Sequence, residues 1–492
     1  MSVRTRFAPS PTGMLHVGAI RTALFAWIIA KQNNGDFILR IEDTDKKREV
    51  KGAVEQIKES LKWLGLEWHE GPDVGGENSP YFQSQRLDIY KKYARQLLEA
   101  GHAYPDPYTQ EQLEEFRGQS KNSNKPFLFR DYRPEFSDKS IEWDETKPLR
   151  LKVPEVKPYS WQDEVRGKLS AGPEALDDFI LIKADGFPTY NFAHIVDDYE
   201  MKITHVIRGE EFISSMPKFL SVYDALGWQP PKFITLPPVL GKNGGKKLSK
   251  REGAMSVLEY RDQGYLKEAV FNFLSSLGWN DGTNQEVYSI DEILNAFSIE
   301  RIQKSPARFE PEKLSWLNGH HIRSKSIEQL FETIKNQGLE TGAKFWPEAA
   351  GKFDNAYKTQ VLKLVQERLK HFDELPQLTK FFFEDQPIDL ELIKNNKQLS
   401  RFSMDEIKAL LKQTIDALEQ SDFSIAGLTD SLNNLLQQTS QKPGVLFSLV
   451  RIATTWAPFS PPLAETLAVL GKETTIRRLN IAISNWESAT RN

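Results

Sequence analysis

Two short segments hold residues that could bind a nucleoside triphosphate. In the first, the loop Pro9-Ser10-Pro11-Thr12-Gly13 leads to His16 and Gly18 at the start of an apolar stretch. Free backbone N–H groups and the helix dipole at such a start favour a phosphate, and a glycine allows close approach. Taken alone, these residues more often form a proline-rich turn with a histidine beside it, because short motifs match by chance.

The second segment runs from Gly241 to Arg251 and combines glycines with five cationic side chains. A mobile lysine loop can close over a triphosphate and neutralise the charge that develops as pyrophosphate leaves. The segment lacks the order of a Walker A loop. Taken alone, the segment is more often a solvated basic surface loop, because that is what most charge runs are.

The elements around the first segment predict how these residues are positioned. A short strand at 3–8, a buried helix at 16–31 and an apolar strand at 37–41 form a β-α-β unit. Such a crossover implies a parallel sheet, which binds ligands at the carboxyl ends of its strands. Further strands are predicted at 205–208 and 233–236, and one at 179–182 that returns toward the first domain. Beyond about residue 267 the pattern is helical, with a capping box at Ser403–Glu406.

Composition excludes several classes of protein. A chain of 492 residues corresponds to about three domains. It has no cysteine, which excludes disulfides, thiolate catalysis and cysteine-ligated metals. The net charge of −4 argues against a uniformly basic surface but leaves room for a local basic face. No apolar run is long enough to span a membrane and no signal peptide is evident, so a cytoplasmic protein is expected.

Together, the two segments resemble the paired signatures of class I aminoacyl-tRNA synthetases. His16-Val17-Gly18-Ala19 stands for one signature and Lys247-Leu248-Ser249-Lys250-Arg251 for the other. The surrounding residues are similar to the bacterial glutamyl-tRNA synthetase family in the family's order. These blocks are Arg6–Gly13, Arg40–Asp45, Pro188–Ala193, Val196–Asp198, Thr204–Glu211, Ser305–Phe309 and Trp316–Gly319. The likeness is much weaker in the helical C-terminal part.

The resemblance implies a role for each matching residue. Arg208, assisted by Arg6, would face the γ-carboxylate of glutamate, which a guanidinium can bind bidentately. The other implied glutamate-binding residues are Ala8, Ser10, Glu42 for the α-ammonium, and Tyr190. His194 is a candidate only, because relatives often carry another residue there and a histidine beside a β-like run is more often structural. The implied ATP-binding residues are His16, Gly18, Glu211, Val239, Leu240, Lys247 and Lys250, of which His16, Gly18, Lys247 and Lys250 would be catalytic.

The family also implies an architecture and partners. The fold class is α/β, with a Rossmann-like parallel-sheet catalytic domain, an α/β insertion and an all-helical anticodon-binding region. The expected parts are 1–80 and 184–240 for the catalytic domain, 81–183 for an acceptor-end-binding insertion, 241–325 for the lysine loop and stem contact, and 326–492 for the anticodon region. The expected activity is ATP-dependent ligation of L-glutamate to tRNA(Glu) by a monomer, with tRNA(Gln) left open as a second acceptor. The alternative is a non-catalytic, synthetase-derived tRNA-binding protein.

Metals enter only with ATP, as Mg²⁺. Many bacterial relatives bind zinc in the insertion through cysteines and a histidine, but Asp106 and Tyr108 stand where cysteines would be, so no zinc is expected. Asp197-Asp198 suggests a structural or tRNA-contacting pair, and His320-His321 a turn, rather than metal sites. Candidates for acceptor-end contacts are Tyr104, Tyr108, Arg117, Phe127, Phe129, Arg130, Tyr132 and Arg133, and basic candidates in the anticodon region are Lys358, Arg368, Arg451 and Arg478.

Overall fold

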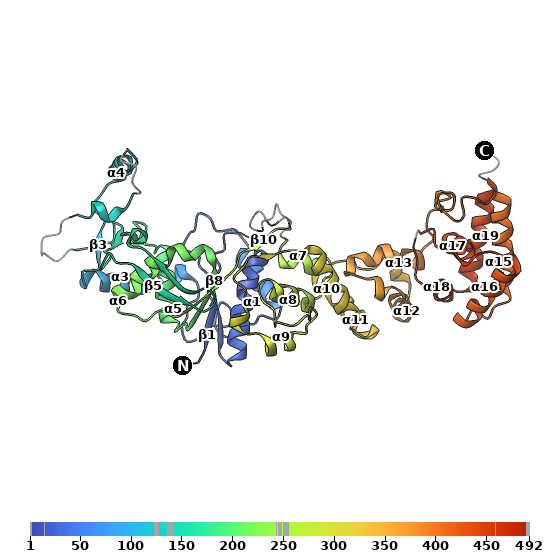
Figure 1. Cartoon of the computed structure of the whole chain (residues 1–492), viewed down its shortest axis with the longest axis horizontal. Helices are drawn as coiled ribbons and strands as arrows, with labels where there is room; N and C mark the ends of the chain where they lie inside the picture. The colour runs from blue at the N-terminus through green and yellow to red at the C-terminus, as the bar shows by residue number, and fades with distance from the viewer. Residues whose placement is uncertain are drawn as a thin grey trace. The chain divides into compact units, whose positions relative to one another are not determined.

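The computed structural model describes residues 2–13, 15–122, 127–134, 142–242, 244, 248, 255–457 and 459–488 (Figure 1). The chain divides into two compact units. The first comprises Met1–Glu259 and Lys267–Leu314, and the second Tyr260–Leu266 and Ser315–Asn492. Among the described residues, no helix is long and apolar enough to cross a membrane.

The first unit opens with the predicted β-α-β crossover. Strand β1 (Arg4–Phe7) pairs in parallel with β2 (Asp36–Leu39), and helix α1 (Val17–Gln32) connects them. Helix α1 is apolar around most of its circumference and eleven of its residues are buried, as expected of a helix inside a domain. The register sets Phe7 opposite Leu39, so both strands end at the same edge.

A second group of strands continues this sheet. β8 (His205–Gly209) and β9 (Lys232–Leu236) are parallel, and β9 also pairs with β5 (Tyr159–Asp163), which forms a hairpin with β6 (Gly167–Ala171). β8 lies beside β1, because the Thr204 N–H donates to the Arg4 carbonyl at 2.9 Å and the Arg4 N–H donates to Thr204 Oγ1 at 2.8 Å. The parallel pairs β1–β2 and β8–β9, with helix α1 between β1 and β2, confirm the predicted α/β fold. Helices α5 (Tyr190–Glu200) and α6 (Met216–Leu226) pack against each other beside it.

The inserted region has a small sheet of its own. Strands β3 (Ala103–Pro105), β4 (Leu149–Leu151) and β7 (Ile180–Ile182) are antiparallel in that order. The strand predicted at 179–182 is present as β7. Its antiparallel partner is β4, so it belongs to the small sheet of the inserted region. Helices α2 (Ala53–Trp63), α3 (Leu87–Glu99) and α4 (Gln110–Asn122) complete this half of the unit.

The segment after the lysine loop returns to the sheet region. β10 (Val239–Leu240) pairs in parallel with β11 (Ala307–Arg308), and α8 (Lys267–Ser276) and α9 (Ile290–Ala296) pack on α1. Helices α7 (Val257–Asp262) and α10 (Pro311–Arg323) each begin in the first unit and end in the second. The turn predicted at His320-His321 is wrong, because both residues lie in the last turn of α10.

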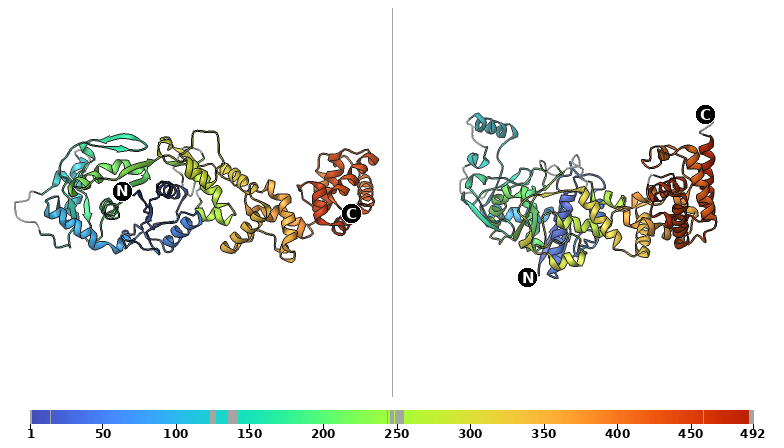
Figure 2. Two further views of the ribbon diagram at one scale, coloured as in Figure 1. Left: turned by 90° about the horizontal axis from the view of Figure 1, so that it is seen from below. Right: turned by 45° about the vertical axis from the view of Figure 1, so that its right-hand side comes forward.

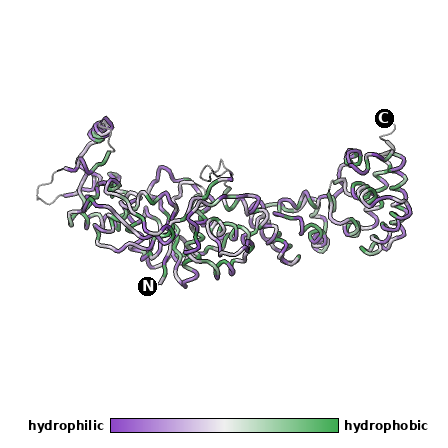
Figure 3. Tube along the Cα trace, in the orientation of Figure 1, coloured by the Kyte–Doolittle hydropathy of each residue, from purple (hydrophilic) through white to green (hydrophobic). Residues whose placement is uncertain are grey.

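The second unit is helical, as predicted. Figure 2 gives two further views, in which these helices follow one another in chain order. Polar and apolar residues alternate along them (Figure 3), which is the pattern of helices with one buried face. The predicted capping box at Ser403 and Glu406 is confirmed. Its helices are α11 (Ile327–Thr341), α12 (Asn355–Val365), α13 (Leu375–Phe383), α14 (Glu391–Lys394), α15 (Met404–Glu419), α16 (Ile425–Thr439), α17 (Pro443–Thr455), α18 (Leu463–Leu470) and α19 (Lys472–Ser488).

Candidate active site

A pocket of about 410 Å³ lies where β1 and β8 end and α1 begins. This is the carboxyl edge of the parallel sheet, where the topology predicts a ligand. Its wall is built from the loop after β1, the first turns of α1, and the segments after β8 and β9. The lining residues are Arg6, Phe7, Ala8, Pro9, Ser10, Thr12, Gly13, Leu15, His16, Gly18, Ala19, Arg21, Thr22, Glu42, Tyr190, Ile207, Arg208, Gly209, Glu211, Phe212, Pro237, Pro238, Val239 and Leu248.

The pocket brings together most of the residues that the sequence singled out. From the glutamate-binding set it contains Arg6, Ala8, Ser10, Glu42, Tyr190 and Arg208, and from the ATP-binding set His16, Gly18, Glu211 and Val239. Two predicted residues, His194 and Leu240, do not line it. Lys247 and Lys250 lie outside the described residues, although Leu248 between them lines the pocket.

The start of α1 explains why a glycine stands at position 18. His16 is the residue before the helix, in extended conformation (φ −97°, ψ 163°). A Cβ on Gly18 would lie 3.2 Å from Cε1 and 3.3 Å from Nδ1 of the His16 ring. Because Gly18 has no side chain, the His16 ring can lie beside it. With the ring in that position, space remains for a ligand at the helix start.

Arg208 supplies the pocket with a buried positive charge. Its side chain reaches the pocket from β8, and the residue is 6% exposed. Its guanidinium lies 5.1 Å from the Phe219 ring centre and 5.5 Å from that of Phe212. Its Nε and Nη1 are buried and have no hydrogen-bond partner among the described residues. Burial lowers the pKa of Arg208 from the usual arginine value. A buried guanidinium with free donors calls for an anionic partner.

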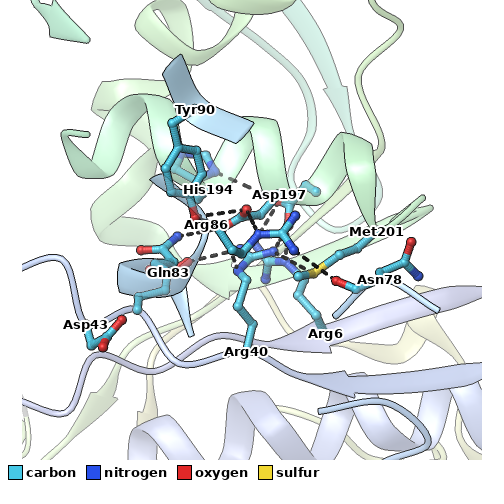
Figure 4. A network of polar contacts seen from close by, with 12 residues as sticks. Arg6, Arg40, Asp43, Asn78, Gln83, Arg86, Tyr90, His194, Asp197 and Met201 are labelled. Atoms are coloured by element: carbon cyan, nitrogen blue, oxygen red, sulfur yellow. Dashed lines mark hydrogen bonds and ion pairs between the residues drawn. The ribbon is translucent and has the colours of Figure 1, made fainter. Parts of the chain in front are cut away.

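A network of buried ions that includes Arg6 and Arg40 adjoins the pocket (Figure 4). Arg6 donates from Nε and Nη2 to the two carboxylate oxygens of Asp198, at 3.0 and 3.2 Å. Arg40, which is fully buried, donates from Nη1 to the same Asp198 at 2.8 Å and from Nη2 to Glu42 at 3.0 Å. The Arg40 guanidinium thus binds Glu42 directly and is connected to Arg6 through their shared partner Asp198. Arg6 and Glu42 both line the pocket.

Asp197 anchors the other side of this network. Its carboxylate accepts from Nε of Arg86 at 2.7 Å and from the hydroxyl of Tyr90, and it lies 3.5 Å from Nε of Arg40. Burial alone would raise the pKa of Asp198, but Arg6 and Arg40 outweigh it and hold that pKa well below its usual range. Asp197 and Asp198 are 0% and 2% exposed. The pair is structural, and its burial removes it from direct contact with tRNA.

The charges in the network balance. Arg6, Arg40 and Arg86 face the three carboxylates of Glu42, Asp197 and Asp198. Arg208 is an additional cation that contributes to none of the ion pairs found among the described residues. The pocket is therefore prepared for a ligand with at least one anionic group that reaches Arg208. Burial raises the pKa of Glu42, against the opposing effects of Arg40 and Arg6.

His194 lies behind the pocket wall rather than in it. It belongs to helix α5, so the β-like setting predicted for it is wrong. Its ring lies between those of Tyr190 and Phe219, with centres 4.7 and 4.5 Å away. Neither ring nitrogen has a hydrogen-bond partner among the described residues, and Nδ1 is 3.9 Å from Asp198. Burial lowers the pKa of His194 to about 3, although Asp198 acts in the opposite direction. The neutral ring supports Tyr190 by packing.

The residues of the insertion that were considered for acceptor-end contact pack largely on one another. The side chain of Tyr104 is buried and donates to Asp178 at 2.8 Å, while Phe129 is 1% exposed. Tyr132 stacks on Phe116 with centres 4.4 Å apart, and Tyr108 donates to the Tyr132 carbonyl. Among the described residues, no group of three or more His, Cys, Asp or Glu side chains could hold a metal ion.

Several pocket residues carried no signal in the sequence. Arg21, Thr22 and Leu248 line the pocket, as do Pro237 and Pro238. Arg21 stands five residues after His16 on α1, so helical periodicity alone would have placed it near the same end of the helix. Leu248 lies within the matched segment Lys247–Arg251, but its uncharged side chain does not itself indicate a ligand contact.

We expect the His194 imidazole to remain uncharged between pH 8 and pH 5. The unfolded chain takes up a proton near pH 6.5 and the native ring does not, so this residue costs stability as pH falls below about 6.5, by about 1.4 kcal/mol per pH unit. NMR of protein carrying ¹³C-labelled histidine measures this, with the resonance identified by its loss in His194→Phe. A His194 resonance that titrates between pH 5 and 8 would contradict the buried, neutral ring.

Two family models match the chain. One described as tRNA synthetases class I (E and Q), catalytic domain, matches residues 2–316, and one described as anticodon binding domain matches residues 328–483.

Full-length relatives share this organisation. The glutamate–tRNA ligase of Chloroflexus aurantiacus is 41% identical over 503 residues, which cover 99% of this chain and 98% of the relative. That of Dehalococcoides mccartyi is 40% identical over 98% of this chain and 97% of the relative. The crystal structure of a glutamate tRNA ligase from Elizabethkingia meningosepticum in complex with its amino acid has a TM-score of 0.87 and 34% identity, covering 98% of this chain and 99% of that one. With the pocket geometry, these matches show that the chain belongs to the glutamate–tRNA ligase family of class I tRNA synthetases.

Proposed function

We propose that this chain is a glutamate–tRNA ligase that activates L-glutamate with ATP and transfers it to the terminal adenosine of tRNA(Glu). The observation that carries the proposal is the buried guanidinium of Arg208, whose Nε and Nη1 have no partner among the described residues, in a pocket that Glu42 also lines. A cation and an anion in one pocket match a ligand with a distal carboxylate and an ammonium group. The neutral amide of glutamine would leave the Arg208 charge uncompensated, which is costly in a buried site.

The glutamate half of the pocket uses the balanced ion network. Arg208 pairs with the γ-carboxylate, and Tyr190 supplies a hydroxyl to the same end. Arg6 is held by Asp198, so it adds positive potential to that end of the pocket without being free to rotate. Glu42, oriented by Arg40, receives the α-ammonium. Ala8 and Ser10 line the side where the α-carboxylate lies.

The ATP half uses the start of α1 and the segment after β9. His16 and Gly18 face the phosphates, Val239 flanks the adenine with Leu240 next to it in β10, and Glu211 lies nearby. Lys247 and Lys250, which lie outside the described residues, bind the triphosphate, which enters with Mg²⁺ as part of the substrate. A glutamate carboxylate oxygen attacks the α-phosphorus and pyrophosphate leaves. A ribose hydroxyl of the tRNA then attacks the carbonyl carbon of the adenylate, and AMP leaves. Positioning and charge stabilisation supply most of the catalysis of such steps.

The remaining parts of the chain bind tRNA. The insertion at 81–183 receives the acceptor end, 241–325 contacts the stem, and 326–492 reads the anticodon. The protein acts as a monomer in the cytoplasm, where its tRNA substrate is used in translation. tRNA(Gln) is a possible second acceptor that the assay below distinguishes.

Within the helical unit, the anticodon site centres on Ser460. Nη1 of Arg368 donates to the Ser460 carbonyl and Nε of Arg451 donates to its hydroxyl, both at 2.9 Å. Burial and repulsion from Arg368 lower the pKa of Arg451. Phe459 is 78% exposed beside them. An exposed ring next to two converging guanidinium groups suits an unstacked base and its phosphate. Arg478 is instead buried against Asp385 and main-chain carbonyls.

Charging of tRNA transcripts with labelled amino acids tests the activity. We expect the protein to charge tRNA(Glu) with glutamate and not with glutamine. Arg208→Gln should raise the glutamate KM by at least about 30-fold, since a lost charge-assisted pair costs about 2–3 kcal/mol. Arg95→Gln, which removes an exposed arginine on α3, is the matched control. Failure to charge either tRNA(Glu) or tRNA(Gln) with glutamate would favour a non-catalytic tRNA-binding protein.

We expect no stoichiometric zinc in the purified protein. Asp106 stands where many relatives carry a zinc ligand, and its carboxylate is engaged by Nε of Arg150 at 2.7 Å. The ring of Tyr108 packs edge-on against Phe116. Elemental analysis of tag-free protein after dialysis against a chelator measures the metal content. One zinc per chain under these conditions would overturn the expectation.

Substitutions around Ser460 should weaken tRNA binding alone. Phe459→Ala should raise the tRNA KM by about fivefold to 100-fold, because stacking of one base is worth about 1–3 kcal/mol. Arg451→Gln should act in the same direction, while the KM values for glutamate and ATP stay unchanged. Ile425→Ala, which removes another exposed apolar side chain of the helical unit, is the control. An unchanged tRNA KM in both variants would remove this site from the proposed anticodon surface.

A further inference from the structure

Arg21 is a buried arginine of the pocket that the proposed reaction leaves without a role. It stands on α1, five residues after His16, and is 3% exposed. Its Nη1 donates to the Leu277 carbonyl at 2.9 Å and its Nη2 donates to the Pro237 carbonyl. Its Nε has no hydrogen-bond partner among the described residues.

Packing alone does not account for this residue. Burial lowers the pKa of Arg21 to about 10, against the attraction of Glu211, so the group stays charged at neutral pH. An apolar side chain of similar volume would fill the space without the desolvation cost of a guanidinium. The two carbonyl contacts are therefore what the arginine adds.

Among the hydrogen bonds found for the described residues, the Pro237 carbonyl accepts from Arg21 and from no other donor. The next three carbonyls are each used by a backbone N–H: that of Pro238 accepts from Ala307, that of Val239 from Leu248, and that of Leu240 from Phe309. Pro238 has no N–H of its own, so strand pairing is interrupted at this point. Arg21 therefore supplies the hydrogen bond to the Pro237 carbonyl, at the point where strand pairing by backbone N–H groups is interrupted.

A third element closes against the same proline. Gly278 has φ +100°, and a Cβ there would lie 3.1 Å from Cγ of Pro237 and 3.5 Å from Nη1 of Arg21. The segment after α8 therefore approaches Pro237 closely. Arg21, Pro237 and Leu277–Gly278 form one joint that fixes the start of β10 against α1.

We propose that Arg21 is a positioning residue for ATP, which acts by holding the Pro237–Val239 wall against the signature helix. Pro237, Pro238, Val239 and Leu248 all line the pocket, and Leu248 pairs with Val239 at the base of the lysine loop. Fixing Pro237 thus fixes the adenine wall and, through Val239, the position of Leu248. The inference rests on the proposed assignment of this half of the pocket to ATP.

The glutamate half is held by other contacts. Arg6, Arg40, Glu42 and Asp198 are joined to one another, and none of the hydrogen bonds found among the described residues connects them to Arg21. Loss of Arg21 should therefore affect the two small substrates unequally. A general loss of folding would not produce that difference.

Steady-state charging of tRNA(Glu) with ATP and glutamate varied separately tests the inference. Arg21→Met should raise the ATP KM by about tenfold or more, because two hydrogen bonds from a charged donor are lost, while the glutamate KM changes less than about twofold. Arg21→Lys should recover part of the ATP effect. Gln32→Met is the matched control, since Gln32 lies on the same helix and donates to two main-chain carbonyls, those of Leu294 and Phe297, away from the pocket.

Gly278→Ala strains the same joint from the side of the segment after α8. It replaces Arg21→Met as the test variant if Arg21→Met does not fold. It should raise the ATP KM and spare that of glutamate. Equal changes in both KM values, or an unchanged ATP KM, in folded Arg21 and Gly278 variants would overturn the role of Arg21. Absence of glutamate charging by the unsubstituted protein would instead overturn the proposed function.

Discussion

The pocket end that we propose for glutamate depends on four buried arginines, which are compensated by three carboxylates among the described residues. Arg6, Arg40 and Arg86 are matched by Glu42, Asp197 and Asp198, and Arg208 is left over. Buried ions without partners are costly, so the three matched arginines cannot turn toward a ligand. The excess charge is thereby confined to Arg208, whose position on β8 is set by the parallel sheet.

The two halves of the pocket are held by different kinds of interaction. On the glutamate side, Arg40 bridges Asp198 and Glu42, so side-chain ion pairs fix the orientation of the charged groups. On the other side, main-chain carbonyls from Pro237 to Leu240 are bound one after another, first by Arg21 and then by backbone N–H groups. Charge recognition needs fixed ionic groups. A pocket wall that is built from main chain needs a fixed backbone.

Much of the candidate site could be predicted because its residues lie in contiguous segments. The loop before α1, Glu42 after β2, and Arg208 at the end of β8 follow strands of one parallel sheet, whose carboxyl ends share an edge. His194 and His320 were assigned to the wrong local structure, since a histidine carries no strong helical or strand preference and tertiary packing decided. The pairing of 180–182 with 149–151 was missed because an antiparallel partner thirty residues away leaves no local signal.

The sequence by itself determined the family resemblance, the β-α-β unit, the helical C-terminal region and the residue types available to the pocket. These follow from local patterns: motif order, apolar periodicity and capping residues such as Ser403 and Glu406. Only the tertiary structure decided which charged side chains pair with one another and which stay available to a ligand. Arg6 and Arg208 look equally available in the sequence, yet Asp198, nearly two hundred residues from Arg6, occupies the first and leaves the second free. Ion pairing between distant residues depends on their distance in the fold, and that distance is not encoded in any short stretch of the chain.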